Sequence, residues 1–436
     1  MVKKGVVFCV LFFLVTALTI WGAGGTEAGG AEKIEITFAH FWGGSNSNYP
    51  ALMEVVEQFN EQSSDIFVKV DTYPTDDPYK PKLAADVAAN TLPDVFFSWP
   101  GPRAKVYVES GTLLDFQKYL DEDPAWRDSF VAGTVQQCTY QGMQASVPIE
   151  TFGLPIFYNK AIFAKYNLSP PETYDDLMNI IKVLRSNGVT PITACIDNGW
   201  TLGLYWHVMS HRLMGTPAVR KSYEVGDFND PGYLEAAKRL LDFRDNKAFP
   251  DDFISLHNDE ATNLFASEKA AMYMHGTWFI GNFTAEGVPE DFIDKVDFFN
   301  FPNIAGGKGT NNDWLSGVIV SLAMAQKLEE DPARLEAAFE FVKYFTSPAA
   351  AKKLAEVGKK PFPVKMTLDP ENFGQLNTDI ATAIAGADNT YTLHTLAPPP
   401  KFRRLIEDEL SAIWLGQKTP EEAMAKVRKE TPEAYR

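Results

Sequence analysis

The sequence predicts an α/β fold of two or three domains, because segments typical of strands and of helices alternate along it. In its first part, strand patterns at 34–38, 67–71 and 94–99 are separated by helix patterns at 50–62 and 82–90. Strands in such a rhythm pair in parallel, and ligands bind near their carboxyl ends. The length of 436 residues supports this division, at about 150 residues per domain.

The second part of the chain continues the alternation. Thr173, followed by Asp176 three residues later, resembles a capping box at a helix start, and Gly188 is suited to end that helix. Apolar residues at helical or strand spacing then predict further helices at 232–246 and 335–345, and strands at 270–274, 296–301 and 317–323. We find no internal repeat, so a repeat architecture is excluded.

Composition excludes several classes of protein. The chain has 40 basic and 57 acidic residues, a net charge of −17, and 45% hydrophobic residues. These are ordinary globular values, which exclude a disordered chain, a fibrous repeat and a polytopic membrane protein. The acidic balance argues against nucleic acid or an anionic membrane surface as a partner, because both are polyanions.

The N-terminus has the pattern of a secretory signal peptide over residues 1–24. Lys3 and Lys4 precede an apolar run at 6–20, and small residues follow. The alternative is a transmembrane anchor, but the run is short for a span of about 20 residues. Cys9 lies inside the run, and the cleavage region has no Cys that could carry a lipid. We therefore expect a periplasmic or extracellular protein without a lipid anchor.

Two further cysteines, Cys138 and Cys195, remain in the mature chain. In an oxidising compartment they could form a disulfide. The simpler interpretation, which we favour, is that both are buried as small hydrophobic residues.

Motifs for catalysis or cofactor binding are missing from the sequence. It contains no GxxxxGK, GxGxxG, HExxH, GxSxG or CxxC. His207 and His211 have a spacing that can hold zinc on a helix, but no third ligand is evident, and a packed helix is the simpler interpretation. We therefore expect no cofactor and no metal. A pair of carboxylates of the glycosidase type stays open at this point.

The tryptophans indicate the chemistry of a binding site. Five of the nine stand where strands end or turns begin, beside Gly, Asn, Asp or Pro: Trp42, Trp99, Trp200, Trp278 and Trp314. An indole ring covers the apolar face of a sugar, while nearby amides and carboxylates bind its hydroxyls. For any one of these residues, packing in the core is an equally good explanation. The pattern across all five favours a sugar site.

A set of motifs, in order along the chain, resembles the bacterial extracellular solute-binding proteins of ABC importers, of the carbohydrate, maltose-binding-protein-like type. Two lie in the first part: Asn90-Thr-Leu-Pro-Asp-Val95, and Pro148-Ile-Glu150 with Phe157-Tyr-Asn-Lys160. Two lie in the second: Pro170-Pro-Glu-Thr-Tyr-Asp-Asp-Leu177, and Phe265-Ala-Ser-Glu-Lys-Ala-Ala-Met272 with Gly276-Thr-Trp278. Any one match is weak, but the ordered set is specific.

The resemblance implies a two-lobed fold with hinge-connected lobes and the ligand in the cleft between them. We place the N-terminal lobe at 32–148 plus 297–346 and the C-terminal lobe at 150–293 plus 350–436. The implied function is to capture a sugar or oligosaccharide and deliver it to the membrane permease of an ABC importer. The protein would then be a monomer and would catalyse no reaction.

The resemblance also implies roles for particular residues. Glu150 stands where the family often places a carboxylate on sugar hydroxyls, and Trp278 corresponds to a common stacking ring. We expect Gly276 to leave room for the approaching ligand. The complete predicted site consists of Trp42, Asn46, Trp99, Glu150, Asp197, Trp200, Gly276, Trp278, Asp313 and Trp314, with Trp206, Tyr391 and His394 as weaker candidates.

Two alternatives stay open. The same fold could bind a polyamine, a peptide or a metal chelate, and an acidic chain would suit a cation. An exported glycosidase is the other alternative. The tryptophans favour the sugar, because stacking on indole suits a pyranose.

Overall fold

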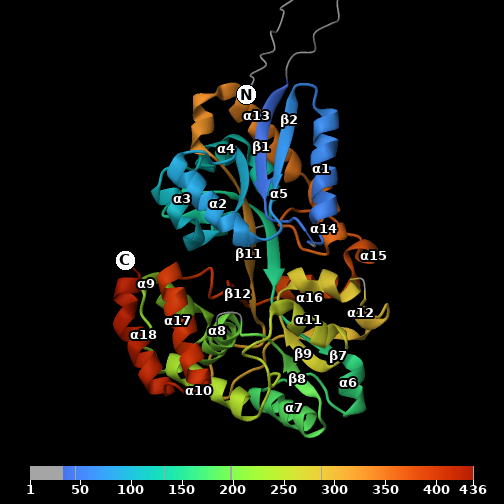
Figure 1. Cartoon of the computed structure of the whole chain (residues 1–436), viewed down its shortest axis with the longest axis vertical. Helices are drawn as coiled ribbons and strands as arrows, with labels where there is room; N and C mark the ends of the chain where they lie inside the picture. The colour runs from blue at the N-terminus through green and yellow to red at the C-terminus, as the bar shows by residue number, and fades with distance from the viewer. Residues whose placement is uncertain (1–32, 45, 132, 197–198, 286, 436) are drawn as a thin grey trace, which may run out of the picture.

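The computed structural model describes residues 33–44, 46–131, 133–196, 199–285 and 287–435, and these form two lobes (Figure 1). The predicted signal peptide and Asp197 lie outside the described residues. Each lobe has a sheet with helices around it, and the two lobes are joined by strands that cross between them. Within the described part of the chain, we find no helix with the length and apolarity needed to span a bilayer.

The N-terminal lobe is built on a mainly parallel sheet. Strands β1 and β2 pair in parallel, as do β1 and β3. The complete strand order is β12-β11-β3-β1-β2, in which β11 (Asp313–Met324) reaches into the C-terminal lobe and pairs there with β12 (Asn389–Tyr391). Apolar side chains such as Phe38, Phe97 and Leu322 form its core. Its elements are β1 (Ile34–His40), α1 (Tyr49–Gln62), β2 (Ile66–Thr72), α2 (Asp76–Ala89), β3 (Val95–Ser98), α3 (Lys105–Glu109), α4 (Gln117–Glu122), α5 (Pro124–Ser129), β4 (Thr139–Tyr140), β5 (Met143–Gln144), α13 (Pro332–Phe345), α14 (Pro348–Gly358) and α15 (Pro370–Phe373).

The C-terminal lobe has its own sheet, in the order β10-β7-β9-β8. Its larger core includes Ile192, Tyr205 and Met272, and the side chain of Trp206 is fully buried in it. Its elements are β7 (Ile156–Asn159), α6 (Lys160–Lys165), α7 (Tyr174–Ser186), β8 (Thr190–Thr193), α8 (Trp200–Met214), α9 (Thr216–Val225), α10 (Pro231–Asp245), α11 (Asn258–Ala266), β9 (Ala270–Met274), α12 (Phe292–Lys295), β10 (Val296–Phe299), α16 (Gln375–Ala385), β12 (Asn389–Tyr391), α17 (Pro400–Trp414) and α18 (Pro420–Ala434).

Two antiparallel strands, β6 (Val147–Gly153) and β11 (Asp313–Met324), cross between the lobes. Leu315 of β11 belongs to the core of the C-terminal lobe, whereas Leu322 belongs to the core of the N-terminal lobe. Likewise Ile149 of β6 lies in the core of the N-terminal lobe, and Phe152 lies in the core of the C-terminal lobe. Glu150 therefore stands at the crossing itself.

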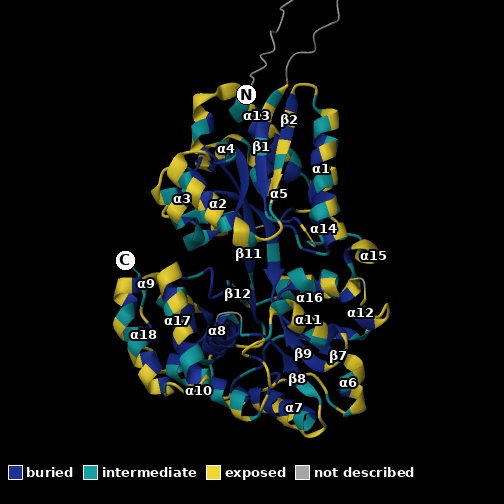
Figure 2. Cartoon of the chain, viewed as in Figure 1, coloured by how far each residue is buried: buried dark blue, intermediate teal, exposed yellow. Residues whose placement is uncertain are grey.

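Figure 2 shows the buried strands in the middle of each lobe, with exposed residues on the outward faces of the helices. This is the burial that the predicted alternation requires. The capping box at Thr173 is present: its Oγ1 accepts from the backbone N–H of Asp176, whose carboxylate accepts from the backbone N–H of Thr173.

The structure corrects several predicted bounds. Strand β10 pairs with β7 in the C-terminal lobe, so residues 297–304, which were expected in the N-terminal lobe, belong to the C-terminal lobe. Residues 350–373 pack in the N-terminal core, because Leu354 faces that core and α14 contacts α1. The helix expected at 82–90 begins already at Asp76, and the last predicted strand lengthens to the whole of β11.

The two thiols have separate surroundings. Cys138 Sγ lies 3.8 Å from the carbonyl oxygen of Thr134, ahead of the crossing. Cys195 Sγ lies 3.9 Å from Asn258 Oδ1 in the C-terminal lobe. Both side chains are buried, as the simpler interpretation expected.

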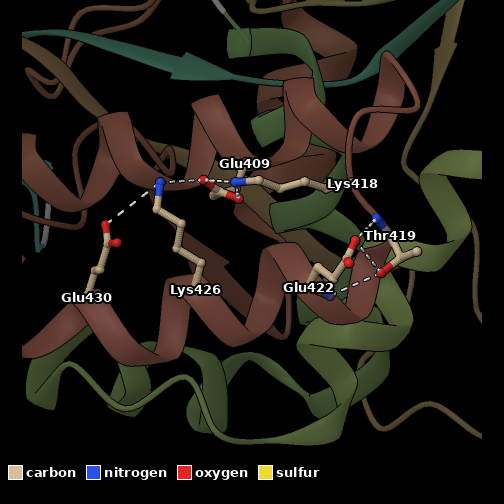
Figure 3. Close-up of polar contacts among 6 residues, drawn as sticks. All are labelled: Glu409, Lys418, Thr419, Glu422, Lys426 and Glu430. Atoms are coloured by element: carbon tan, nitrogen blue, oxygen red, sulfur yellow. Dashed lines mark hydrogen bonds and ion pairs between the residues drawn. The ribbon is translucent and has the colours of Figure 1, made fainter.

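A buried carboxylate ties together the last two helices of the chain (Figure 3). Glu409 of α17 is 2% exposed. Lys418 Nζ donates to its two carboxylate oxygens at 2.8 and 2.6 Å, and Lys426 Nζ of α18 donates to Oε1 at 2.8 Å. Burial by itself raises the pKa of Glu409, but the two lysines outweigh burial and hold the pKa below its ordinary value.

Replacing both lysines, in Lys418→Met/Lys426→Met, should destabilise the protein by about 1–3 kcal/mol at pH 7, because a buried carboxylate loses its partners. The folded-state pKa of Glu409 is depressed, so this stabilisation is present above the unfolded-state pKa and is lost as the pH falls through the folded-state pKa. Urea unfolding at pH 7 and pH 3 should therefore show a difference that shrinks in acid. An equal difference at both pH values would contradict this account.

Candidate functional site

A cavity of about 400 Å³ lies between the lobes. Its upper wall comes from the segments after β1, β2 and β3, that is, from the carboxyl ends of the parallel strands, where α/β sheets place ligands. Its lower wall comes from α11 and from the 3₁₀ helix Thr277–Thr284. Five predicted residues line it together: Trp42, Asn46, Trp99, Glu150 and Trp278.

Aromatic neighbours hold the three indole rings of the cavity in place. Trp99 stacks on Phe41, with ring centroids 5.4 Å apart, and Trp42 meets Phe97 edge-on at 4.7 Å. Trp278 meets a ring of the crossing strand, that of Phe152, at 5.5 Å. Trp42 and Trp99 are almost fully buried, whereas Trp278 is half-buried and is therefore the ring with most surface available to a ligand.

The loop after β1 is fixed by backbone contacts. Gly43 donates its N–H to the carbonyl of Tyr73 at 2.9 Å, and a Cβ on Gly43 would lie 2.6 Å from that oxygen. Only glycine permits this close approach. Asn46 Oδ1 accepts from the backbone N–H of Asn48 at 3.0 Å and from Lys360 Nζ at 3.2 Å. The loop thus presents Trp42 and Asn46 to the cavity in a fixed geometry.

Glu150 is a buried carboxylate that faces the cavity. The residue is 3% exposed and lines the cavity from the crossing strand. Among the described residues we find no hydrogen-bond donor to its carboxyl oxygens. Burial raises its pKa, and the charge of Lys360 opposes that rise. Its oxygens open onto the cavity, so their donors come from water or from a ligand there, and the hydroxyl groups of a ligand are suitable donors.

Gly276 has a different role from the one predicted. A Cβ at this position would lie 2.1 Å from the six-membered ring of Trp278. The glycine therefore makes room for the indole of Trp278, and not directly for a ligand.

Gly276→Ala should consequently displace the Trp278 ring, because the added methyl group overlaps it. We expect a blue or red shift of the intrinsic tryptophan emission and weaker ligand binding, with the melting temperature lowered by a few degrees at most. Gly386→Ala, whose Cβ would make only ordinary contacts, 3.7 Å from the carbonyl oxygen of Ala383, is the control outside the cavity. Unchanged emission and unchanged binding in Gly276→Ala would refute the role of this glycine.

Trp200, Asp313 and Trp314 lie outside this cavity. Trp200 packs beside His275, with ring centroids 5.6 Å apart. Asp313 is buried and accepts from Asn389 Nδ2 at 2.6 Å, which joins β11 to β12. Trp314 is buried, with its ring centroid 6.1 Å from that of Phe298. All three have local structural partners that explain them.

The weaker candidates also have structural partners. Trp206 donates its indole N–H to the carbonyl of Tyr233 at 3.0 Å. His394 Nε2 lies 3.2 Å from Glu407 Oε1, and the ring of Tyr391 stacks on His211 with centroids 3.6 Å apart.

The zinc alternative finds no support. Both ring nitrogens of His207 have partners, Tyr223 Oη at 3.0 Å and the carbonyl of Thr392 at 2.9 Å. The described residues contain no cluster of three metal-ligating side chains. The pair at His207 and His211 therefore belongs to a packed helix.

Two cations of the cavity wall were missed by sequence reasoning. Arg103 lies over the ring of Trp99, 5.2 Å from its centroid, and Lys360 lies over that of Trp42 at 5.6 Å. Arg103 follows the same strand end as Trp99, so its position along the chain was a usable signal. Lys360 enters from a distant segment, and nothing near it in the sequence marks it.

A larger cavity of about 580 Å³, next to the first, is lined by Gln137, His207, Tyr391 and their neighbours. Several of its polar groups already have partners: Gln137 Oε1 accepts from the backbone N–H of Val318, and Arg220 donates to the carbonyl of Thr390. Because the tryptophans and the unsatisfied carboxylate line the smaller cavity, we place the functional site there.

A two-lobed α/β fold with a ligand-sized cavity between hinged lobes defines the class of solute-binding proteins. Residues 43–352 match the family model described as "Bacterial extracellular solute-binding protein". The match covers more than half of the chain, so the chain belongs to this family. The family resemblance and the two-lobed fold predicted from the sequence are both confirmed.

Several known proteins are similar to the chain. It is 22% identical over 371 residues to the multiple sugar-binding protein of Streptococcus mutans, covering 82% of each chain. A structure described for xylan utilization by Caldanaerobius polysaccharolyticus has a TM-score of 0.81 and 26% identity, with coverage of 91% of this chain and 100% of that one. A chitin oligosaccharide binding protein has a TM-score of 0.82 and 24% identity, with coverage of 92% and 99%.

Proposed function

We propose that this protein captures a sugar or oligosaccharide in the cavity between its lobes and delivers it to the permease of an ABC importer. The observation that carries the proposal is the convergence of Trp42, Trp99 and Trp278 on one cavity with the unsatisfied carboxylate of Glu150. Indole rings stack on the apolar faces of sugars, and a carboxylate accepts from their hydroxyls.

The mechanism is binding coupled to closure of the lobes. The N-terminal lobe supplies Trp42 and Trp99, the C-terminal lobe supplies Trp278, and Glu150 stands on the crossing strand between them. A ligand that bridges both walls favours the closed arrangement, because only that arrangement lets it make both sets of contacts.

Similar proteins support a sugar ligand. The Streptococcus mutans relative is a multiple sugar-binding protein, and the structure at 26% identity is described for xylan utilization. We rank a polyamine below a sugar because three indole rings line the cavity. The charges do not decide between them, since Asp76, Glu150 and Asp259 line the cavity together with Arg103 and Lys360.

We propose further that the bound sugar is not cleaved. Relatives of the chain are binding proteins, which supports this proposal. A glycosidase needs two carboxylates about 5–10 Å apart across the scissile bond, and because Asp76, Glu150 and Asp259 all line the cavity, the absence of cleavage is tested directly. Incubation with xylotriose and chitotriose, followed by chromatography, should return both intact. Release of shorter sugars would support the glycosidase alternative.

The family is extracellular, and we propose that residues 1–24 are the cleaved signal that exports this chain. The mature protein would be a monomer without a lipid anchor, in the periplasm or outside the cell.

The test of the function is a thermal-shift screen against xylotriose, chitotriose, raffinose, maltose, spermidine and a tripeptide. A ligand that binds only the folded state raises the melting temperature with its concentration. We expect at least one sugar to do so, and spermidine and the peptide to have no effect. A response to spermidine or the peptide alone would contradict the proposal.

A further inference from the structure

Lys360 is a buried ammonium group in the wall of the cavity. The residue is 6% exposed, and its Nζ lies 3.2 Å from Asn46 Oδ1 and 5.6 Å from the centroid of the Trp42 ring. Among the described residues, Asn46 Oδ1 is the atom that accepts a hydrogen bond from Lys360 Nζ. Since an ammonium group has three N–H donors, two remain for a ligand.

The backbone around Lys360 brings this lysine close to Glu150. Helix α14 ends at Gly358, the left-handed φ of 55° at Lys359 turns the chain, and Lys360 is buried directly after it. Thr151 then donates its backbone N–H to the carbonyl of Pro361 at 3.0 Å. The residues after Lys360 and after Glu150 are thus joined directly.

The same segment is also tied to the loop that carries Asn46. Ser47 Oγ donates to the carbonyl of Gly358 at 2.9 Å. Residues 358–361 therefore link the crossing strand to the loop after β1, and Lys360 is held by both. A side chain fixed this way loses little freedom when it binds a ligand.

Lys360 and Glu150 have opposite charges in one cavity. Burial lowers the pKa of Lys360 and raises that of Glu150, and each group holds the other toward its charged form. The other charged side chains that line the cavity are Asp76, Arg103 and Asp259. Glu150 offers acceptors without donors, and Lys360 offers donors without acceptors.

We propose that Lys360 determines ligand specificity: with Glu150 it selects a neutral ligand whose hydroxyl groups donate to the carboxylate and accept from the ammonium. Glu150 repels an anionic ligand such as an acidic sugar, and Lys360 repels a cation such as a polyamine. This inference rests on the proposed sugar-binding function and adds the charge class of the sugar.

The experiment compares the wild type with Lys360→Met and the control Lys359→Met by calorimetric titration at pH 7.5. The probes are xylotriose, chitotriose, raffinose and maltose as neutral sugars, digalacturonate as an acidic sugar, and spermidine. The wild type should bind one neutral sugar at least tenfold more tightly than digalacturonate or spermidine. Lys360→Met should weaken that sugar at least tenfold, and Lys359→Met should leave it within twofold.

A pH profile separates this role from a merely structural one. Without Lys360 the pKa of Glu150 rises further, so sugar binding to Lys360→Met should begin to fall at a higher pH than in the wild type. Asp76, Arg103 and Asp259 are the same in both proteins, so they do not account for a difference. Lys360→Gln replaces the methionine variant if that variant fails to give a cooperative melt.

The outcomes distinguish the two proposals. A wild type that binds none of the sugars overturns the sugar-binding function and this inference together. A wild type that binds a neutral sugar, with unchanged affinity and pH profile in Lys360→Met, overturns the inference and leaves the function standing. Preference of the wild type for digalacturonate over every neutral sugar overturns the charge class.

Discussion

Glu150→Gln is expected to weaken sugar binding by about 10- to 100-fold, because a hydrogen bond to a charged group contributes about 1.5–3 kcal/mol. Glutamine keeps the size of the side chain but replaces one strong acceptor with a donor. The fold should survive, since the carboxylate has no hydrogen-bond donor among the described residues. Removal of its charge also removes the unfavourable free energy of burying that charge. Titration calorimetry with the sugar identified by the screen measures the loss.

The control for this variant is Glu35→Gln, a residue of β1 outside the cavity, which should bind like the wild type. The wild type should also lose affinity as the pH falls through the pKa of Glu150, which burial raises. The sign follows because the ionised form is the one that accepts from hydroxyls. Glu150→Gln should lack this part of the pH dependence. Wild-type affinity in a folded Glu150→Gln protein would remove the carboxylate from the site.

Trp278→Ala is the second variant with a large expected effect. It removes the half-buried ring of the C-terminal wall, and by analogy with stacking on nucleic-acid bases the loss is about 1–3 kcal/mol, or at least tenfold in affinity. Trp278→Phe should recover part of it, because phenylalanine keeps a stacking face.

Trp414→Ala is the matched control, because Trp414 is also half-buried in the C-terminal lobe but packs on Phe253, away from the cavity. We expect it to lower the melting temperature without changing the affinity. Near-native affinity in Trp278→Ala, or an equal loss of affinity in Trp414→Ala, would show that stacking on Trp278 does not hold the ligand.

Local sequence patterns predicted the fold well because they report on local structure. The strand at 270–274 was predicted at the bounds that β9 has. The lobe assignment was wrong at 297–304 and 350–373, because strand pairing and helix docking decide to which lobe a segment belongs. The pairing of β10 with β7 joins segments more than a hundred residues apart, and no local pattern marks such a contact.

The predicted site illustrates the same distinction. Trp42 and Trp99 could be grouped because they follow β1 and β3 of one sheet, whose carboxyl ends meet at one edge. Trp278 follows β9 of the other sheet and reaches the same cavity from the opposite lobe. Trp314 has similar neighbours in the sequence but packs beside Phe298 inside the lobe. Neighbours such as Gly, Asn and Asp therefore indicate that a tryptophan lies near the end of a strand, but not whether its ring points into the core or into the cavity.

Lys360 could not be predicted for another reason. The role proposed for Lys360 depends on Glu150, which lies in a different part of the chain. It also depends on the backbone hydrogen bond between Thr151 and Pro361, which brings the two segments together. Its neighbour Lys359 is the same residue type, yet it does not line the cavity. Only the turn at the end of α14 separates the two.

The central claim is that the ligand is held between the lobes at the smaller cavity. A crystal structure with the best-binding sugar of the screen tests it most directly. We predict electron density for the sugar against Trp278, with a hydroxyl within hydrogen-bond distance of the Glu150 carboxylate and another near Lys360 Nζ. Density in the neighbouring cavity beside His207 and Tyr391, with the smaller cavity empty, would contradict the account.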